Sequence, residues 1–190
     1  MPGKSSGLTL ALIVGWLGVV LPCPALAAEG ETYDQKTIFQ EASGFFGKGA
    51  QGLGKVVEKI FNDLGRPNAY IKGREAGGAL VVGLRYGDGR LQQKAGGRRK
   101  VHWNSPSIGF DAGGNAAKVF VLVYDLPSTG AIFRRFPAVD GSFYYIAGVG
   151  VNYHRAGGIT LAPIRLGVGL RAGINVGYIH YRKNKSWNPL

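Results

Sequence analysis

From Asn68 onward the sequence alternates short apolar and polar runs with glycine-rich turn signals, and this pattern restricts the possible folds most strongly. In residues 164–171, for example, aliphatic residues alternate with arginine or glycine. Turn signals recur roughly every 8 to 14 residues, which is typical of hairpins joined in sequence. The pattern predicts an antiparallel meander. About eight such strands in a small domain close most naturally into a barrel, which also removes exposed strand edges.

The candidate strands are residues 69–75, 77–86, 89–95, 98–103, 106–112, 116–125, 142–154, 158–171 and 173–182. Turns are expected at residues 87–89, 95–97, 113–115, 140–141 and 156–158, where glycine, asparagine or aspartate tolerates positive φ. Glycine supplies 32 of the 190 residues without a collagen-like period. We expect glycines inside strands to let a strand bend or another group approach the sheet closely.

Residues 34–64 carry the helical pattern of the chain. Apolar residues recur at spacings of three and four, which predicts an amphipathic helix that stops at Gly65 and Pro67. Glycines at 44, 47, 49, 52 and 54 weaken the middle of this segment, so we expect two helical pieces with a bend. The two pieces are expected to cover a sheet or plug a barrel end; the alternative is a membrane-surface or partner-docking element.

The long connection of residues 126–137 exceeds the length of a hairpin loop. Ser128 or Thr129 could cap one short helix there before Pro137 ends it. We interpret this connection as a lid or a cap on the barrel.

The first 27 residues have the organisation of a secretory signal peptide. Lys4 precedes an apolar run of about 14 residues, and Ala25-Leu26-Ala27 supplies a small-residue cleavage pattern. We therefore expect a signal peptide at 1–27, an N-terminal helical segment at 28–66 and a barrel at 67–190, the last two forming one domain. Cys23 is the one cysteine of the chain and leaves with the signal, and Pro22 before it disfavours a lipoprotein. Disulfides and cysteine-zinc sites are thereby excluded from the mature chain.

The charge of the mature chain points to anionic partners. The full chain has 23 basic and 11 acidic residues and a net charge of +12, and removal of Lys4 leaves +11. An exported basic protein meets anionic lipid headgroups, lipopolysaccharide phosphates or acidic peptidoglycan and polysaccharide more often than nucleic acid.

Catalytic signatures are missing from the sequence, so we predict no enzyme activity, no cofactor and no metal site. No nucleophile elbow, phosphate-binding loop or zinc-protease motif occurs. The histidines at 102, 154 and 180 are too scattered to propose a metal site, and the aspartates at 111, 125 and 140 flank turns. Basic residues interleaved with aromatic ones are more informative, because this combination can bind a phosphate or a sugar. The candidate ligand-binding residues are Arg98, Arg99, Trp103, Arg134, Arg135 and Trp187.

Several short motifs in a fixed order resemble the EipA-like family, a domain of unknown function exported to the periplasm of Gram-negative bacteria. They are Gly65-Arg66-Pro67-Asn68, Gly83-Leu84-Arg85-Tyr86-Gly87, Val123-Tyr124-Asp125-Leu126-Pro127, Arg134-Arg135-Phe136, Val139-Asp140-Gly141-Ser142, Pro163-Ile164-Arg165, Asn175-Val176-Gly177-Tyr178 and Trp187-Asn188-Pro189. The resemblance implies a soluble periplasmic protein with an eight-stranded β-barrel, connected with envelope integrity and stress resistance. It implies no activity, ligand or catalytic residue. Asp125 stands where asparagine is familiar in this family.

We expect a non-catalytic periplasmic protein that supports the envelope by binding a lipid, a glycan or another anionic component. An integral outer-membrane β-barrel is the first alternative, because strands of roughly 10 residues with aromatics fit that class. A hydrolase acting on peptidoglycan is the second. The identity of the ligand and the oligomeric state stay open at this point.

Overall fold

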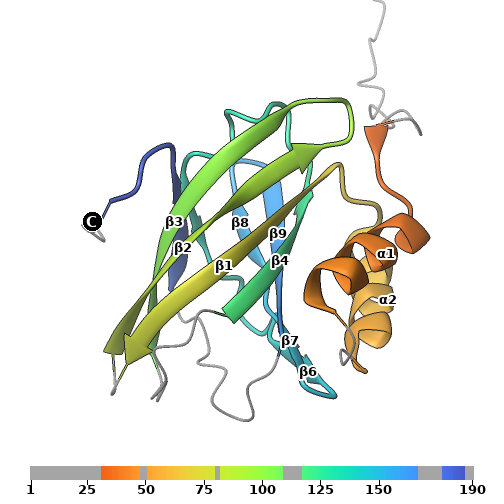
Figure 1. Ribbon diagram of the computed structural model, residues 1–190, viewed down its shortest axis with the longest axis horizontal. Helices are drawn as coiled ribbons and strands as arrows, with labels where there is room; N and C mark the ends of the chain where they lie inside the picture. Colours follow the sequence, from red (N-terminus) through yellow and green to blue (C-terminus); the bar gives the residue numbers. More distant parts are fainter. Residues whose placement is uncertain (1–30, 48–50, 80–81, 109–116, 167–176, 187–190) are drawn as a thin grey trace, which may run out of the picture.

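The computed structural model describes residues 31–47, 51–79, 82–108, 117–166 and 177–186. In these residues two helices lie beside one strongly curved antiparallel sheet (Figure 1). The predicted signal segment 1–27, the predicted turn at 113–115, Asp111 and Trp187 lie outside the described residues.

The start of α1 and the end of α2 lie at residues that the sequence marks for this. Helix α1 (Gln35–Phe46) begins after Asp34, whose carboxylate accepts hydrogen bonds from the Thr37 amide at 2.8 Å and from the Thr37 hydroxyl at 2.7 Å. Helix α2 (Leu53–Leu64) ends at Gly65, where φ is 75°. The prediction of two helical pieces is confirmed. Neither described helix is long and apolar enough to cross a bilayer.

The strands are β1 (Ala69–Ala79), β2 (Val82–Gln93), β3 (Arg98–Ile108), β4 (Ala117–Tyr124), β5 (Arg135–Pro137), β6 (Tyr144–Ile146), β7 (Val149–Val151), β8 (His154–Ala156), β9 (Ile159–Leu166) and β10 (Tyr178–Arg182). Their order is β5-β10-β3-β2-β1-β4-β9-β7-β6, and β8 also pairs with β9. Every described pair is antiparallel.

The curved sheet returns on itself where the chain after β5 meets the start of β8. One isolated β-bridge joins Ala138 to His154 there, and the Val139 amide donates a 2.8 Å hydrogen bond to the Tyr153 carbonyl. His154 Nδ1 lies 3.1 Å from the Phe136 carbonyl oxygen. This junction is called the seam below. The predicted mainly-β, barrel-like fold is confirmed.

Alternation along the strands sends side chains into two separate cores. The inward side chains fill the barrel and include Ile71, Leu91, Val101, Trp103, Val121, Phe136, Leu161, Ile179 and Tyr181. Outward side chains of β1, β4, β7 and β9 pack under the helices and include Tyr70, Phe120, Leu122, Val149 and Ile164, against Ile38, Ala42, Val56 and Ile60. The helices therefore cover one part of the outer surface of the sheet and leave the outward faces of β2 and β3 to solvent.

The turn predicted at residues 87–89 is wrong, because β2 runs through these residues without interruption. Gly87 lies opposite Trp103 on β3, and Gly73 lies opposite Gly89. A methyl group on Gly73 or Gly87 would overlap the Trp103 indole, so these glycines make room for the ring inside the barrel. The breaks predicted near residue 76 and between 103 and 106 are also absent, since β1 and β3 are continuous there.

Other turn predictions are confirmed. Gly96 and Gly97 adopt φ of 106° and 97° between β2 and β3, Gly141 adopts 69°, and Gly157 and Gly158 adopt positive φ between β8 and β9. The predicted single strand at 142–154 is instead divided into β6, β7 and β8, because Ala147 and Gly148 form a tight hairpin turn there.

The short helix predicted in residues 126–137 is wrong. The segment makes consecutive turns, with the Ala131 amide bonded to the Ser128 carbonyl and the Phe133 amide bonded to the Gly130 carbonyl. Leu126 and Ile132 are buried in the barrel core, so the segment is held by apolar packing rather than by helical hydrogen bonds.

Replacement of Gly87 by alanine tests the packing of Trp103 on the glycines. We expect Gly87→Ala to lower the free energy of unfolding by about 1–3 kcal/mol, because the methyl group overlaps the indole. The control is Gly44→Ala in α1, where no other atom lies within 4 Å of the added methyl group. That change should raise the free energy of unfolding by about 1 kcal/mol. Urea denaturation measures both values, and an unchanged or more stable Gly87→Ala protein would contradict this account.

The histidine at the seam predicts a pH dependence. Burial and then the nearby charge of Arg165 lower the pKa of His154 to about 4 from its ordinary value of 6.5. The folded state therefore keeps His154 neutral while the unfolded state binds a proton, so stability falls as the pH drops from about 6.5 to about 4, by on the order of 3 kcal/mol. Urea denaturation of wild type and His154→Gln at pH 7, 5 and 4 isolates this contribution. Parallel pH profiles for the two proteins would refute it.

Candidate functional site

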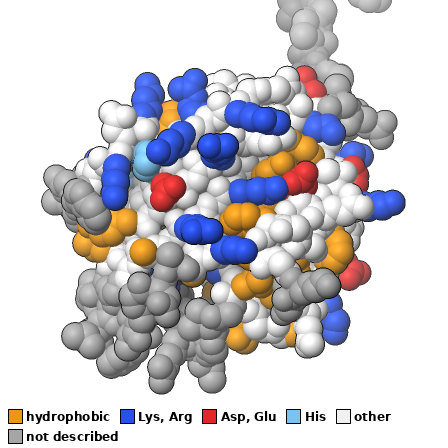
Figure 2. Space-filling model, in the orientation of Figure 1, with side chains coloured by type: hydrophobic (Ala, Val, Ile, Leu, Met, Phe, Trp, Pro, Cys, Tyr) orange, Lys and Arg blue, Asp and Glu red, His pale blue; other side chains and the backbone are white. Residues whose placement is uncertain are grey.

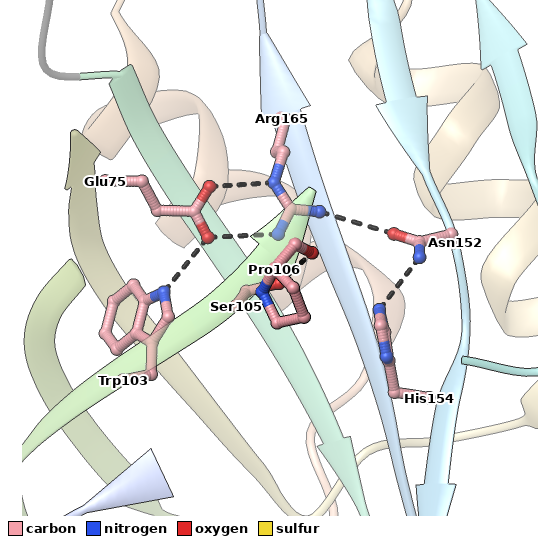
Figure 3. A network of polar contacts seen from close by, with 7 residues as sticks. All are labelled: Glu75, Trp103, Ser105, Pro106, Asn152, His154 and Arg165. Carbon is pink, nitrogen blue, oxygen red and sulfur yellow. Dashed lines mark hydrogen bonds and ion pairs between the residues drawn. The ribbon is translucent and has the colours of Figure 1, made fainter. Parts of the chain in front are cut away.

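A buried ion pair lies inside the barrel behind the solvent-facing strands. Arg165 of β9 donates from Nε to Glu75 Oε2 at 2.9 Å and from Nη2 to Oε1 at 3.0 Å. Trp103 Nε1 donates a further hydrogen bond to Glu75 Oε1 at 3.0 Å (Figure 3). Burial alone raises the pKa of Glu75, but the Arg165 charge and these hydrogen bonds outweigh it and hold the pKa below its usual value. The carboxylate is thereby kept ionised, and both of its oxygens accept hydrogen bonds.

The same arginine begins a chain of polar contacts toward the seam. Arg165 Nη1 lies 3.3 Å from Asn152 Oδ1, and Asn152 Nδ2 lies 2.8 Å from His154 Nε2 (Figure 3). Because a guanidinium only donates, the Asn152 oxygen accepts and its amide nitrogen donates to the histidine. His154 Nδ1 then carries the proton and donates to the Phe136 carbonyl. The contacts assign His154 its neutral form, in agreement with its lowered pKa.

The outward face of β1, β2 and β3 carries rows of like charges. Lys72 lies directly opposite Arg90, and Arg90 lies directly opposite Lys100. Lys72 pairs with Glu41 of α1, whereas Arg90 and Lys100 have no ion-pair partner in the part of the chain that the structure describes. Figure 2 shows lysine and arginine side chains gathered over this face. We call the outward surface of β1–β3 the cationic face.

The next row of the cationic face mixes charges of both signs. Arg74 lies opposite Asp88, Asp88 lies opposite His102, and His102 lies opposite Arg182 of β10. A single carboxylate therefore stands among cations in this row.

Two hollows lie along the cationic face. The larger, of about 740 Å³, has a floor that includes Ala76, Gly77 and Gly87 and a wall that includes Tyr86 and the chain after β10. The smaller, of about 580 Å³, runs toward Phe45 of α1. Both share Arg74, Asp88 and Lys100 in their lining, so they form parts of one surface. We call the larger hollow the groove.

The structure brings two of the six predicted ligand-binding residues to this surface. Arg98 lines the smaller hollow, and Trp103 lies beneath the groove with only 3% of its surface exposed. Trp103 thus supports the floor from inside the barrel. Arg99 points to the other side of β3, where its guanidinium lies 5.9 Å from the centre of the Phe133 ring.

The remaining candidates lie elsewhere. Arg134 is exposed and donates from Nε to the Ala131 carbonyl at 3.0 Å. Arg135 lies over the Tyr178 ring at 5.1 Å, beside His180. Trp187 is outside the described residues. Arg134 and Arg135 are therefore separate from the groove.

Sequence reasoning missed Lys72, Arg74, Arg90 and Lys100 as a group. Their signal is the spacing of two residues between Lys72 and Arg74 and between Arg98 and Lys100, which places each pair on one face of a strand. Because a turn was wrongly predicted at residues 87–89, the sequence pattern did not indicate that Arg90 lies opposite both Lys72 and Lys100.

The scattered histidines and aspartates do not gather into a metal site. Within the described ranges, no group of three histidine, cysteine, aspartate or glutamate side chains could hold a metal ion. Asp125 and Asp140 are exposed at turns, and His102 lines the groove.

Loss of the Glu75 carboxylate tests the role of the buried ion pair. We expect Glu75→Gln to lower the free energy of unfolding by about 3–5 kcal/mol, because the Arg165 charge stays buried without a counter-charge. The double variant Glu75→Gln/Arg165→Met should recover part of this loss, because it removes both charges. Urea denaturation of the two proteins makes the comparison. The coupling would be contradicted if the double variant were less stable than Glu75→Gln, with the destabilisation by Arg165→Met simply added to that of Glu75→Gln.

Comparison with known proteins gives the chain a family. A search of curated proteins found no match. A crystal structure of a beta-barrel-like, uncharacterized protein from Brucella abortus is 41% identical, with a TM-score of 0.77 over 84% of this chain and 99% of that one. The model of the family described as envelope integrity protein A (EipA) matches residues 31–190. With the fold, the sequence identity and the extent of this match in agreement, the chain belongs to the envelope integrity protein A family.

Proposed function

We propose that this protein is an exported, soluble and non-catalytic binding protein of the periplasm. In this proposal it supports the integrity of the envelope by holding an anionic envelope component on its cationic face. The observation that carries the proposal is the row of Lys72, Arg90 and Lys100 on three neighbouring strands, in which Arg90 lies directly opposite both lysines.

Such a row is unfavourable for the fold by itself. Like charges directly opposite in a sheet destabilise it, by roughly 0.2–1 kcal/mol for each pair. An anionic surface reverses this effect and gains about 1 kcal/mol for each lysine or arginine close to it. Arg90 and Lys100, which have no ion-pair partner among the described residues, therefore favour a binding role for this face.

The charged outward face also weighs against the alternative of an integral membrane barrel. In that class the outward side chains of the strands contact lipid and are apolar, and an arginine or lysine at the bilayer centre costs about 2–4 kcal/mol. Here the outward positions of β1–β3 carry Lys72, Arg74, Arg90, Arg98 and Lys100.

The arrangement of the carboxylates supports a non-catalytic role. Glu75 is bound by Arg165 and Trp103 inside the barrel, so both of its oxygens already have partners. Asp88 is exposed in the groove next to Arg74 and His102. A hydrolase with paired carboxylates needs a second carboxylate near the first, and the described lining of the groove has Asp88 and the engaged Glu75 alone.

Charge reversal on the cationic face tests the proposal. We expect Arg90→Glu/Lys100→Glu to weaken binding of the mature protein to phosphatidylglycerol vesicles by roughly tenfold or more, since two attractive charges become repulsive. Lys36→Glu/Lys55→Glu changes the net charge equally, but at exposed positions in the first turns of α1 and α2, where glutamate is favourable. Vesicle co-sedimentation at low and high salt measures the binding.

The control pair should retain nearly wild-type binding, and high salt should weaken the wild type. Equal losses in both double variants would show that only net charge matters and would overturn the assignment to the cationic face. Absence of wild-type binding at low salt would overturn the proposed function itself.

A further inference from the structure

We infer that the groove on the cationic face binds a phosphorylated saccharide. The inference rests on the proposed function, because it names the class of ligand that the same face takes. Three features of the groove carry it: its volume, the mixture of charges around it, and an aromatic ring in its wall.

The groove is hollowed over Ala76, where only a methyl group rises from the outward face of β1. The sheet beneath is backed from inside by the Trp103 indole, which lies against the inward positions 73 and 87 and is itself fixed by Glu75. At about 740 Å³ the groove has the volume of a pocket for a small organic ligand. A sugar ring fits a hollow of this size.

The rim supplies cations for a phosphate. Arg74, Lys100 and Lys185 line the groove, and all three are exposed residues. A guanidinium binds phosphate oxygens in a bidentate manner, and an ammonium adds a compact charge. The rim therefore favours a ligand with one strongly anionic group.

The carboxylate of Asp88 distinguishes this groove from a binding site for a simple anion such as inorganic phosphate. The carboxylate lies between Arg74 and His102 in the cross-strand row, directly in the lining of the groove. It repels phosphate, but it accepts hydrogen bonds from hydroxyl groups. A ligand with both an anionic group and hydroxyls satisfies Asp88 and the cations together, whereas inorganic phosphate or an apolar chain does not.

The wall of the groove offers a surface for the sugar ring itself. The Tyr86 ring in the groove wall gives the apolar face of a sugar ring a surface to pack on.

The first test compares three soluble probes. Calorimetric titration of the mature protein at physiological ionic strength with glucose 6-phosphate, glucose and inorganic phosphate should give an affinity for the sugar phosphate that exceeds both others by roughly tenfold. Equal affinities for glucose 6-phosphate and inorganic phosphate would overturn the inference, because the saccharide would then add nothing.

The second test fills the groove over Ala76 without changing the charge. Ala76 is exposed, so Ala76→Phe fills the groove from the surface, and Ala95→Phe places the same ring at the exposed β2–β3 turn as a control. We expect Ala76→Phe to weaken glucose 6-phosphate binding by roughly tenfold, while Ala95→Phe binds as wild type. Unaltered binding by Ala76→Phe, with its melting temperature preserved, would overturn the inference.

A third variant changes the preference rather than the space. Asp88→Asn removes the carboxylate that accepts from hydroxyls and repels phosphate, so affinity for inorganic phosphate should rise while affinity for glucose 6-phosphate falls. A parallel rise for both probes would assign the site to anions alone and overturn the inference.

Vesicle binding keeps this inference distinct from the proposed function. Ala76→Phe should bind phosphatidylglycerol vesicles as wild type, because the row of Lys72, Arg90 and Lys100 is unchanged. Wild-type vesicle binding without glucose 6-phosphate binding would overturn the saccharide site and leave the cationic face in place. Stronger binding to vesicles with a phosphorylated glycolipid than to the soluble sugar phosphate would support a lipid headgroup as the source of the saccharide.

Discussion

The buried ion pair between Glu75 and Arg165 is the interaction on which most of the barrel depends. It brings a full positive and a full negative charge inside, where each is costly unless its partner and further hydrogen bonds satisfy it. Trp103 donates a further hydrogen bond to Glu75, and Asn152 accepts one from Arg165 Nη1. Because Arg165 can only donate, it fixes the direction of each hydrogen bond that follows in this series. It thereby determines which way the Asn152 amide is turned and which nitrogen of His154 carries the proton at the seam.

The same pair holds the packing inside the sheet. Trp103 is fixed by Glu75 and lies against glycines in β1 and β2, on the inner side of strands whose outward side chains line the groove. Glycine in a strand gives up side-chain packing and costs conformational entropy. In this molecule the indole fills the space left by the inward glycines, so the glycine-rich part of the sheet is densely packed inside.

The features predictable from the sequence are those set by neighbouring residues. Asp34 and Gly65 mark helix ends, and the glycine turns at 95–97 and 156–158 lie where expected, because a few adjacent residues decide each of them. The role of Gly87 depends on Trp103 in the next strand, and Glu75 meets Arg165 across 90 residues of sequence. The row of Lys72, Arg90 and Lys100 likewise follows from strand register, so neither the groove nor the cationic face could be derived before the pairing of β1, β2 and β3 was known.

The seam gives the ring of strands one weak joint. Neighbouring strands elsewhere share several consecutive pairs, eleven between β1 and β2, whereas the two sides of the seam share one isolated bridge. Thermal opening of a folded protein begins where the fewest contacts must break. We therefore expect the barrel to open first between β5 and β8, while the long ladder of β1, β2 and β3 keeps its pairing.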